Sequence, residues 1–133
     1  MKNTVLADTG PLYAAVDPDD QYHTRSQQEL QRLATNQYTV LLPCPILLEA
    51  YTLILYRLGK QVAKTWCSEV IAGTVLINPL SHDYNLAINK VAEYSDQKIT
   101  LFDSVLAILA ERLHYPVWTY DFHFDVMQTA VWR

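Results

Sequence analysis

The stretch Thr4-Val-Leu-Ala-Asp-Thr-Gly-Pro-Leu12 decides how the rest of the chain is interpreted. Its apolar residues before Asp8 make a run of the length of a buried strand, and the breakers Gly10 and Pro11 follow at once. Pro11 suits the first turn of a helix, so the order is strand, acid, tight turn, helix. In open α/β sheets, ligands bind at the edge where such strands end. Asp8 is therefore a candidate site residue, although a turn or helix-capping role alone would also place an acid here.

The composition predicts one globular domain over residues 1–133. The chain is 50% hydrophobic and 18% charged, and a domain of this size buries roughly two-thirds of its unfolded surface. No apolar run approaches the roughly 18 residues of a membrane span, and the first residues lack the apolar core of a signal peptide. Because Cys44 and Cys67 lie in apolar surroundings without metal-binding spacing, we expect reduced thiols in a cytoplasmic protein. The net charge of −4 does not favour a nucleic-acid-binding protein, but bound metal would neutralise several acids.

Apolar periodicity predicts strands that alternate with helices. We expect strands at 5–7, 38–42, 75–77 and 117–119, and helices at 13–16, 21–34, 46–58, 61–72, 82–94 and 101–113. Residues 120–125 are predicted to form a loop or short turn, and 130–132 are a candidate fifth strand at the sheet edge. Strands that alternate with helices or helical hairpins favour a three-layer α/β/α sandwich around a central, mainly parallel sheet of four to five strands.

The predicted topology brings four acids to one edge of that sheet. Asp8 and Asp121 follow the carboxyl ends of the first and fourth strands. Glu49 lies in the first turns of the helix after the second strand, and Asp103 in the first turn of the helix that leads into the fourth strand. Both of these helices begin where parallel strands end. We therefore expect all four carboxylates to line one rim, although more than 110 residues of sequence separate the first from the last.

Each acid also has a simpler local explanation. Thr100-x-x-Asp103 resembles a capping box, and Asp121 between two aromatic residues could form a turn. Glu49 is harder to explain locally, because its helix is apolar nearly all round and an unpaired charge there would need a cation or hydrogen bonds. The common location of the four favours one shared site over separate local roles. Three other acids lie within helices among polar neighbours and are interpreted as solvent-facing: Glu29, Glu69 and Glu111.

Several short motifs together resemble those of PIN-domain proteins of the VapC toxin type, over about residues 4 to 126. They are Asp8-Thr9 after the first strand, Asp20-Gln-Tyr-His23, Glu49 in an apolar helix, Tyr94-Ser-Asp96, Thr100-Leu-Phe-Asp103-Ser, and Thr119-Tyr-Asp121-Phe-His-Phe124. The resemblance implies an α/β/α ribonuclease that depends on Mg²⁺ or Mn²⁺ and is often a toxin paired with a small antitoxin. Many members carry a further acid where this chain has His123, which leaves a second metal position open.

The chemistry of the four acids can be argued without the family. Clustered carboxylates without cysteines or paired histidines favour a hard cation with oxygen ligands, Mg²⁺ or Mn²⁺, over zinc. We assign Asp8 and Asp103 as direct ligands, with Glu49 and Asp121 completing the pocket directly or through water. Such an ion polarises a phosphodiester, helps to generate hydroxide from water and stabilises the leaving oxygen. The four acids are thus candidate catalytic and metal-binding residues of an endoribonuclease.

Other polar residues could assist these acids. The Thr9 and Thr119 hydroxyls could orient the carboxylates, although both threonines could equally be strand-end or capping residues. Arg57, Lys60 and Lys64 flank a helix turn and are candidates for contact with RNA phosphates, although a solvated basic face would look the same.

Hydrophobic surface on two helices predicts a protein partner. The helix at 46–58, together with a Val62, Trp66 and Val70 face on the next helix, offers more apolar surface than one sheet needs to cover. We expect burial against a second copy, which would make a homodimer, or against an antitoxin.

Other functions remain possible for this sequence. A phosphate-binding receiver or phosphatase would also gather acids at this edge, but the chain has no D-x-D-x-T motif after the first strand and no lysine after a late strand. A non-catalytic module that binds protein or RNA, and an RNA-processing nuclease that is not a toxin, are the remaining alternatives.

Overall fold

A four-stranded, all-parallel sheet forms the centre of the computed structural model, which describes residues 3–133. The strands are β1 (Thr4–Ala7), β2 (Thr39–Pro43), β3 (Val75–Ile77) and β4 (Val117–Trp118), in the spatial order β3-β2-β1-β4. Leu6 of β1 is in register with Leu41 of β2 on one side and with Val117 of β4 on the other. Because β1 is central and buried on both faces, all four of its residues are buried and its sequence does not alternate with polar residues.

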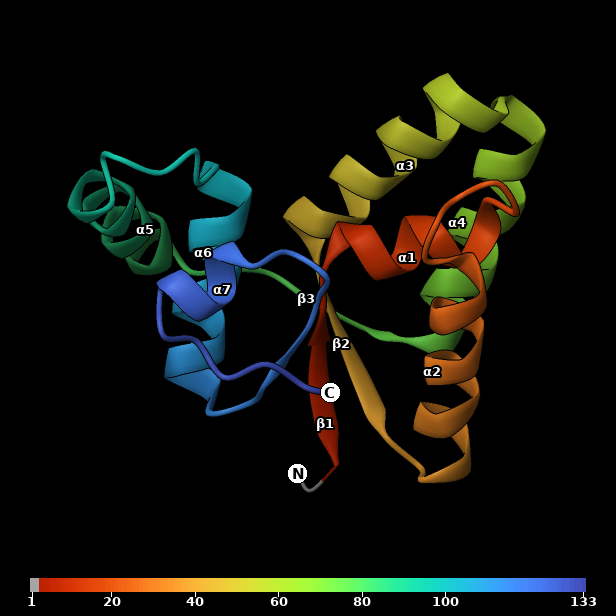
Figure 1. The fold of residues 1–133 in the computed structure, drawn as a ribbon, viewed down its shortest axis with the longest axis horizontal. Coiled ribbons are helices and arrows are strands. Elements are labelled where there is room, and N and C mark those ends of the chain that lie inside the picture. Colours follow the sequence, from red (N-terminus) through yellow and green to blue (C-terminus); the bar gives the residue numbers. More distant parts are fainter. Residues whose placement is uncertain (1–2) are drawn as a thin grey trace.

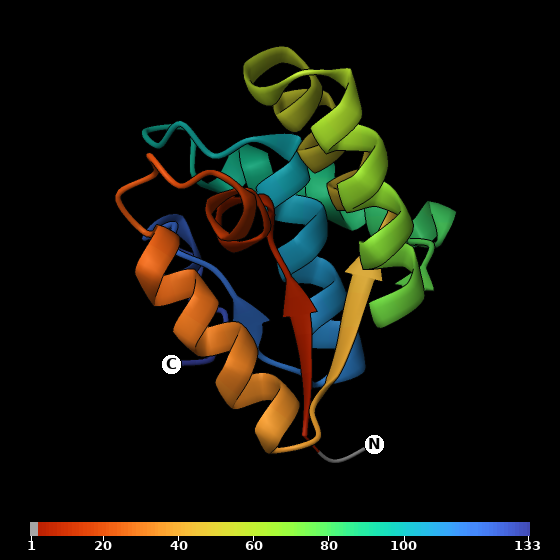
Figure 2. The same cartoon turned by 90° about the vertical axis from the view of Figure 1, so that its right-hand side faces the viewer.

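Helices cover both faces of the sheet, which confirms the predicted three-layer α/β/α class (Figure 1). One layer contains α1 (Thr9–Val16), α2 (His23–Thr35), α3 (Cys44–Leu58) and α4 (Lys60–Gly73). The other contains α5 (Ser81–Glu93), α6 (Leu101–Leu113) and the short α7 (His123–Val126). Helix α3 packs against α1 and α4, and Figure 2 shows α3 and α4 reaching beyond the carboxyl ends of β1 and β2. In residues 3–133, no helix has the length and apolar character needed to cross a membrane.

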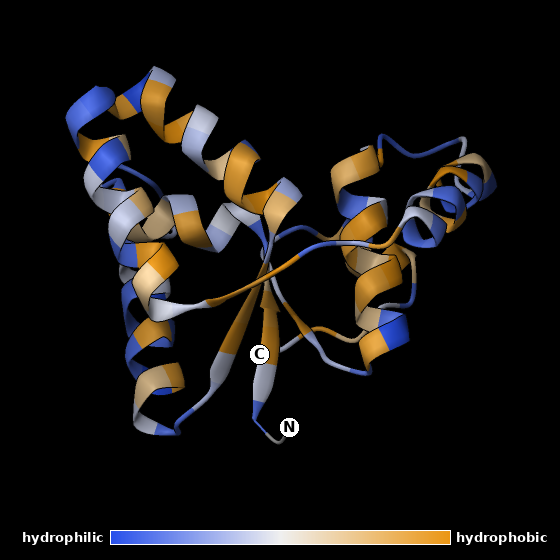
Figure 3. Cartoon of the chain, turned by 180° about the vertical axis from the view of Figure 1, so that it is seen from behind, coloured by the Kyte–Doolittle hydropathy of each residue, from blue (hydrophilic) through white to orange (hydrophobic). Residues whose placement is uncertain are grey.

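The hydrophobic core lies on both sides of β1. Apolar residues concentrate on the strands and on the stretches of helix that face them (Figure 3). Helix α6 is buried continuously from Ser104 to Ala110, because α5 and α7, as well as the sheet, pack against it. Each fully buried leucine, such as Leu6 or Leu106, contributes on the order of 1.5–3 kcal/mol relative to an exposed one.

The structure corrects some predicted boundaries. Helix α1 begins at Thr9, directly after Asp8, so Gly10 and Pro11 lie in its first turn and no separate turn precedes it. The segment 130–132 is not a strand, because only Val131 forms a bridge, with Val117. The predicted loop after β4 includes the short helix α7.

Candidate active site

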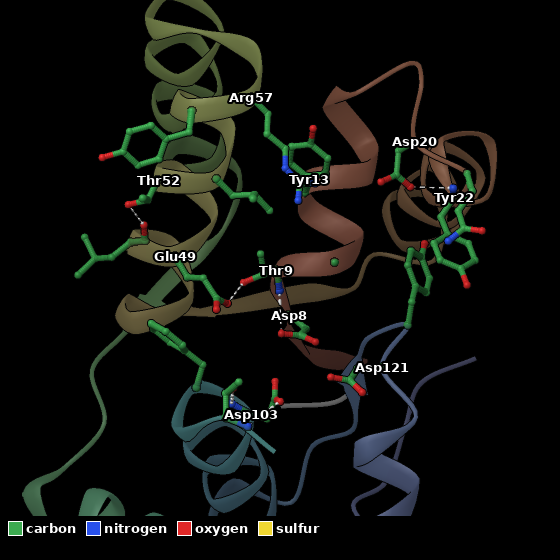
Figure 4. A pocket seen from close by; sticks show the side chains of 18 residues that line it. Asp8, Thr9, Tyr13, Asp20, Tyr22, Glu49, Thr52, Arg57, Asp103 and Asp121 are labelled. Carbon is green, nitrogen blue, oxygen red and sulfur yellow. Dashed lines mark hydrogen bonds between the residues drawn. The ribbon is translucent and has the colours of Figure 1, made fainter. Parts of the chain in front are cut away.

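The carboxyl ends of β1 and β4 meet at the point where the strand order changes direction, since β2 and β4 lie on opposite sides of β1. Such a switch point is the usual ligand site of an open α/β sheet. A cavity of about 890 Å³ opens there, and Asp8, Glu49, Asp103 and Asp121 all line it (Figure 4). We call this space the acidic cavity. The structure thus brings together the four acids that the sequence placed on one rim.

Asp8 lies at the base of the acidic cavity and is only 6% exposed. It caps the amino end of α1, since its Oδ1 accepts a hydrogen bond of 2.8 Å from the Thr9 amide. Its Oδ2 accepts a bond of 2.7 Å from the Thr119 hydroxyl. Burial raises the pKa of the Asp8 carboxyl to about 7; these two bonds oppose the rise, and the charges of Asp103 and Glu49 add to it. Without a cation, therefore, much of Asp8 is protonated at neutral pH.

Glu49 faces Asp8 from α3 and is half-buried. The Thr9 hydroxyl donates a hydrogen bond to its carboxylate (Figure 4). Burial raises the pKa of Glu49, and the charge of Asp103 raises it further. Thr9 therefore links two acids of the cavity, through its amide to Asp8 and through its hydroxyl to Glu49.

Asp103 occupies the first turn of α6 and forms the capping box that its sequence suggested. Its Oδ2 accepts a bond of 3.2 Å from the Thr100 amide, and its own amide donates to the Thr100 hydroxyl at 3.2 Å. Burial raises the pKa of Asp103, and so does the charge of Asp121. The capping role and the location in the cavity are compatible, because a helix amino terminus that begins at the strand ends presents its first acid to the same rim.

Asp121 follows β4 and adopts a turn in which its Oδ1 accepts a bond of 2.9 Å from the His123 amide. Its own amide donates to the Thr119 hydroxyl at 3.0 Å. The side-chain Nδ1 of His123 lies 3.0 Å from the same Oδ1, yet it is buried and makes no hydrogen bond with the described residues. Possible ligand atoms of Asp103, Asp121 and His123 lie within 4.8 Å of one another. His123, which the sequence placed near Asp121 but for which a surface or packing role was favoured, therefore lies at the edge of the site.

Solved structures share this architecture. VapC20 from Mycobacterium tuberculosis, described as a sarcin–ricin loop cleaving toxin, matches with a TM-score of 0.84 and 15% identity over 97% of this chain and 98% of that one. VapBC2 from Rickettsia felis, bound to a DNA fragment from their promoter, matches with a TM-score of 0.73 and 14% identity over 96% of both chains. FitAcB from Neisseria gonorrhoeae matches with a TM-score of 0.68 and 16% identity over 97% of this chain and 96% of that one. The chain has a PIN-like fold. Comparisons with family models and with curated proteins gave no match.

The donor atoms of this PIN-like site fit a divalent cation. Oxygen ligands from four carboxylates suit Mg²⁺ or Mn²⁺. The orphaned Nδ1 of His123 is a buried atom that a cation or its bound water could satisfy. Burial raises the pKa of Asp8, Glu49 and Asp103 together, and none of the ion pairs within residues 3–133 involves these three acids. A cation bound among them would offset their repulsion.

Among the predicted basic residues, only Arg57 lines the acidic cavity of the PIN-like fold. Its guanidinium lies 5.2 Å from the centre of the Tyr13 ring at the cavity wall. Lys60 and Lys64 are exposed on α4 and are not among the residues that line the cavity. Arg57 is therefore the better placed of the three for a phosphate in the cavity.

The prediction that Glu29 faces solvent is wrong. Glu29 is 8% exposed, and its Oε1 accepts a bond of 3.0 Å from the Trp118 indole and another from the Tyr120 hydroxyl. The sequence did contain a sign that Glu29 is buried, because Ser26, Glu29 and Leu33 recur at helical spacing, and all three lie on the buried face of α2. The polar side chains around Glu29 concealed it.

Proposed function

We propose that the chain is a metal-dependent endoribonuclease that hydrolyses RNA phosphodiester bonds. The observation that carries this proposal is the convergence of Asp8, Glu49, Asp103 and Asp121 on one cavity at the carboxyl edge of the sheet. The PIN-like fold supports it, since the similar VapC20 is described as a sarcin–ricin loop cleaving toxin. The raised pKa values of three of these acids support it further, because buried acids with raised pKa values are more common at functional sites.

In this proposal Asp8 and Asp103 hold the cation directly, and Glu49 and Asp121 complete its ligands directly or through water. Bound Mg²⁺ or Mn²⁺ would supply Lewis acidity, which lowers the pKa of a coordinated water and offsets charge on the phosphoryl group. Thr119 orients the Asp8 carboxylate, and Thr9 orients both Asp8 and Glu49.

The residues of the chain also supply a route for the proton. As the water oxygen forms its bond to phosphorus, the bond from phosphorus to the leaving ribose oxygen breaks, and the water loses a proton. Glu49, half-buried and with a raised pKa, lies at the cavity wall and accepts that proton. The leaving oxygen takes a proton from solvent, and Arg57 holds the phosphate by charge.

A non-catalytic RNA-binding module is the main alternative. Such a module gains nothing from several buried acids, because their negative charges repel RNA phosphates unless a cation intervenes. The acidic cavity therefore favours the nuclease over the binding module.

We further propose that the protein is a cytoplasmic toxin of a type II toxin–antitoxin pair and that it forms a homodimer. The likeness to VapBC2 and FitAcB supports an antitoxin partner. At the rim of the acidic cavity, which both residues line, α3 exposes Leu48 (64%) and Tyr56 (82%), and such an apolar rim suits burial against another chain. Trp66, which the sequence suggested for the partner surface, is only 6% exposed and packs inside the domain.

The test of the nuclease is RNA cleavage by the purified chain. We expect cleavage with Mg²⁺ or Mn²⁺, loss of cleavage with excess chelator, and recovery when metal is restored. Asp8→Asn and Asp103→Asn should each reduce the rate at least a hundredfold, because each keeps its volume and loses a charge that holds the metal. Glu69→Gln, an exposed acid on α4, is the matched control and should cleave like the wild type. Undiminished cleavage in both Asp variants, or in chelator, would overturn the proposal.

A further inference from the structure

Glu29 is a buried carboxylate that lies outside the acidic cavity. It projects from α2, does not line the cavity, and takes no part in the chemistry described above. Its Oε1 accepts hydrogen bonds from the Trp118 indole, at 3.0 Å, and from the Tyr120 hydroxyl. Its Oε2 lies 3.4 Å from Nε of Arg25, one turn earlier on the same helix. A carboxylate this deeply buried is costly unless it is bonded, so these partners hold it in one place.

The two donors to Glu29 flank Thr119, which is bonded to an acid of the cavity. Trp118 and Tyr120 bond to Glu29, whereas Thr119 between them donates to Asp8. In an extended chain, alternate side chains point in opposite directions, and this stretch follows that rule. The Thr119 hydroxyl also accepts the Asp121 amide at 3.0 Å. The segment 118–121 is therefore held from two sides, by Glu29 on one and by Asp8 on the other.

Tyr120 is fixed by more than its hydroxyl. Its ring lies 4.8 Å from the ring of Tyr22, and the Arg25 guanidinium lies 4.3 Å from its centre. The Tyr120 hydroxyl donates to Glu29, as a phenol can at physiological pH. Tyr120 cannot move without breaking this cluster, and Asp121 is its chain neighbour.

We infer that Glu29 is a positioning residue: by holding Trp118 and Tyr120, it sets where Thr119 and Asp121 stand, and hence how tightly the acidic cavity binds its cation. This inference rests on the proposed function, since it concerns the same site. It gives α2, which contributes none of the four acids, a part in the placement of Thr119, which is bonded to Asp8, and of Asp121, which lines the acidic cavity.

The test compares Mn²⁺ affinity, by calorimetric titration of metal-free protein, among variants that remove the contact in steps. Glu29→Ala leaves both donors without an acceptor and should weaken Mn²⁺ binding about tenfold, the lower end of the effect of groups that orient metal ligands. Tyr120→Phe deletes one hydroxyl and should weaken binding less. Glu29→Gln should bind almost as the wild type does, because its amide oxygen still accepts from Trp118 and Tyr120.

A second buried acid provides the matched control. Asp83 is fully buried and bonded twice to Arg112, at 2.9 and 2.8 Å, between α5 and α6 and away from the acidic cavity. Asp83→Asn should lower the melting temperature without changing Mn²⁺ affinity, which separates positioning from general destabilisation.

Each result of the titrations decides the inference. Equal Mn²⁺ affinity in folded Glu29→Ala and wild type would overturn it and leave the proposed nuclease intact. If Glu29→Ala does not fold, Tyr120→Phe with wild-type affinity would overturn it in the same way. An equal loss of affinity in Asp83→Asn would also overturn it. A wild-type protein that binds no Mn²⁺ would overturn the proposed function and this inference together.

Discussion

Asp8 and Asp83 are the same residue type at nearly the same burial, yet their environments shift the pKa in opposite directions. Asp83 is fully buried, and its bonds to Arg112 hold its pKa below the ordinary value. Asp8 is almost as buried, and its pKa rises to about 7, with the charges of Asp103 and Glu49 adding to the effect of burial. Asp83 has its counter-ion within the chain, whereas none of the ion pairs within residues 3–133 involves Asp8. The difference distinguishes an acid that stabilises the fold from one that needs a cation supplied from outside.

The largest expected effect that separates these two acids is the dependence of stability on pH. The folded-state pKa of Asp8 is raised from 3.8 to about 7, so the folded chain binds more protons than the unfolded chain between these values. Stability from this group is fully present below about pH 4, falls as pH rises, and has been lost above about pH 7, a change on the order of 4 kcal/mol. Asp83 has a lowered pKa and acts in the opposite direction. Its contribution to the stability of the folded chain is lost only as the pH falls through its folded-state pKa.

Denaturant unfolding of the metal-free protein at several pH values between 4 and 7 measures this effect. Because other groups titrate in the same window, the quantity to compare is the stability of Asp8→Asn minus that of the wild type. We expect this difference to grow with pH. Parallel curves for the two proteins would show that Asp8 does not titrate differently in the folded chain.

The second expected effect concerns Asp83, the acid that is paired with Arg112. Asp83→Asn should lower the free energy of unfolding at pH 7 by at most about 3 kcal/mol, the low end for a broken buried pair, because Arg112 loses its partner but is 38% exposed and therefore screened by solvent. RNA cleavage per folded molecule should not change, since neither residue lines the acidic cavity. Denaturant unfolding and the cleavage assay on the same preparation measure both. An Asp83→Asn variant that is as stable as the wild type but cleaves RNA more slowly would contradict the structural role that we assign to Asp83 and the functional role that we assign to Asp8.

The same contrast explains how much the sequence could predict. The placement of Asp8, Asp103 and Asp121 at one edge could be predicted because each follows a local signal, a strand end or a helix start, and the topology of parallel strands brings such points together. Their local explanations also proved correct, since Asp8 caps α1, Asp103 forms a capping box and Asp121 makes a turn. Capping and a shared site are compatible, because helix starts at the carboxyl edge point their acids to one place.

Glu29 and the sheet edge show where sequence reasoning fails. The partners of Glu29, Trp118 and Tyr120, lie about 90 residues later in the chain, and no local pattern reports how α2 packs across β4. Residues 130–132 have the apolar composition of a strand, but the chain leaves the edge of β4 after the single bridge of Val131 to Val117. Both errors concern contacts between distant segments, which depend on packing.

The smallest of the three effects is the stabilisation by metal, and it tests the cavity most directly. If Asp8 and its neighbours need a cation, Mn²⁺ at a hundred times its dissociation constant should stabilise the wild type by roughly 2.7 kcal/mol.

Asp83→Asn, although less stable at the start, should gain the same amount, because its lost ion pair lies outside the cavity. Asp8→Asn should begin more stable than the wild type at pH 7 without metal and gain less from Mn²⁺, since it has already lost part of the repulsion and one ligand charge. At a fixed Mn²⁺ concentration, the gain in the wild type should also rise between pH 6 and 8, because binding must displace the proton that Asp8 carries near its pKa of about 7. Thermal unfolding of the three proteins over a series of Mn²⁺ concentrations, at each pH, measures their starting stabilities and their gains from metal. A wild-type melting temperature that does not change in millimolar Mn²⁺ would mean that the acids bind no cation, and the nuclease proposal would lose its physical basis.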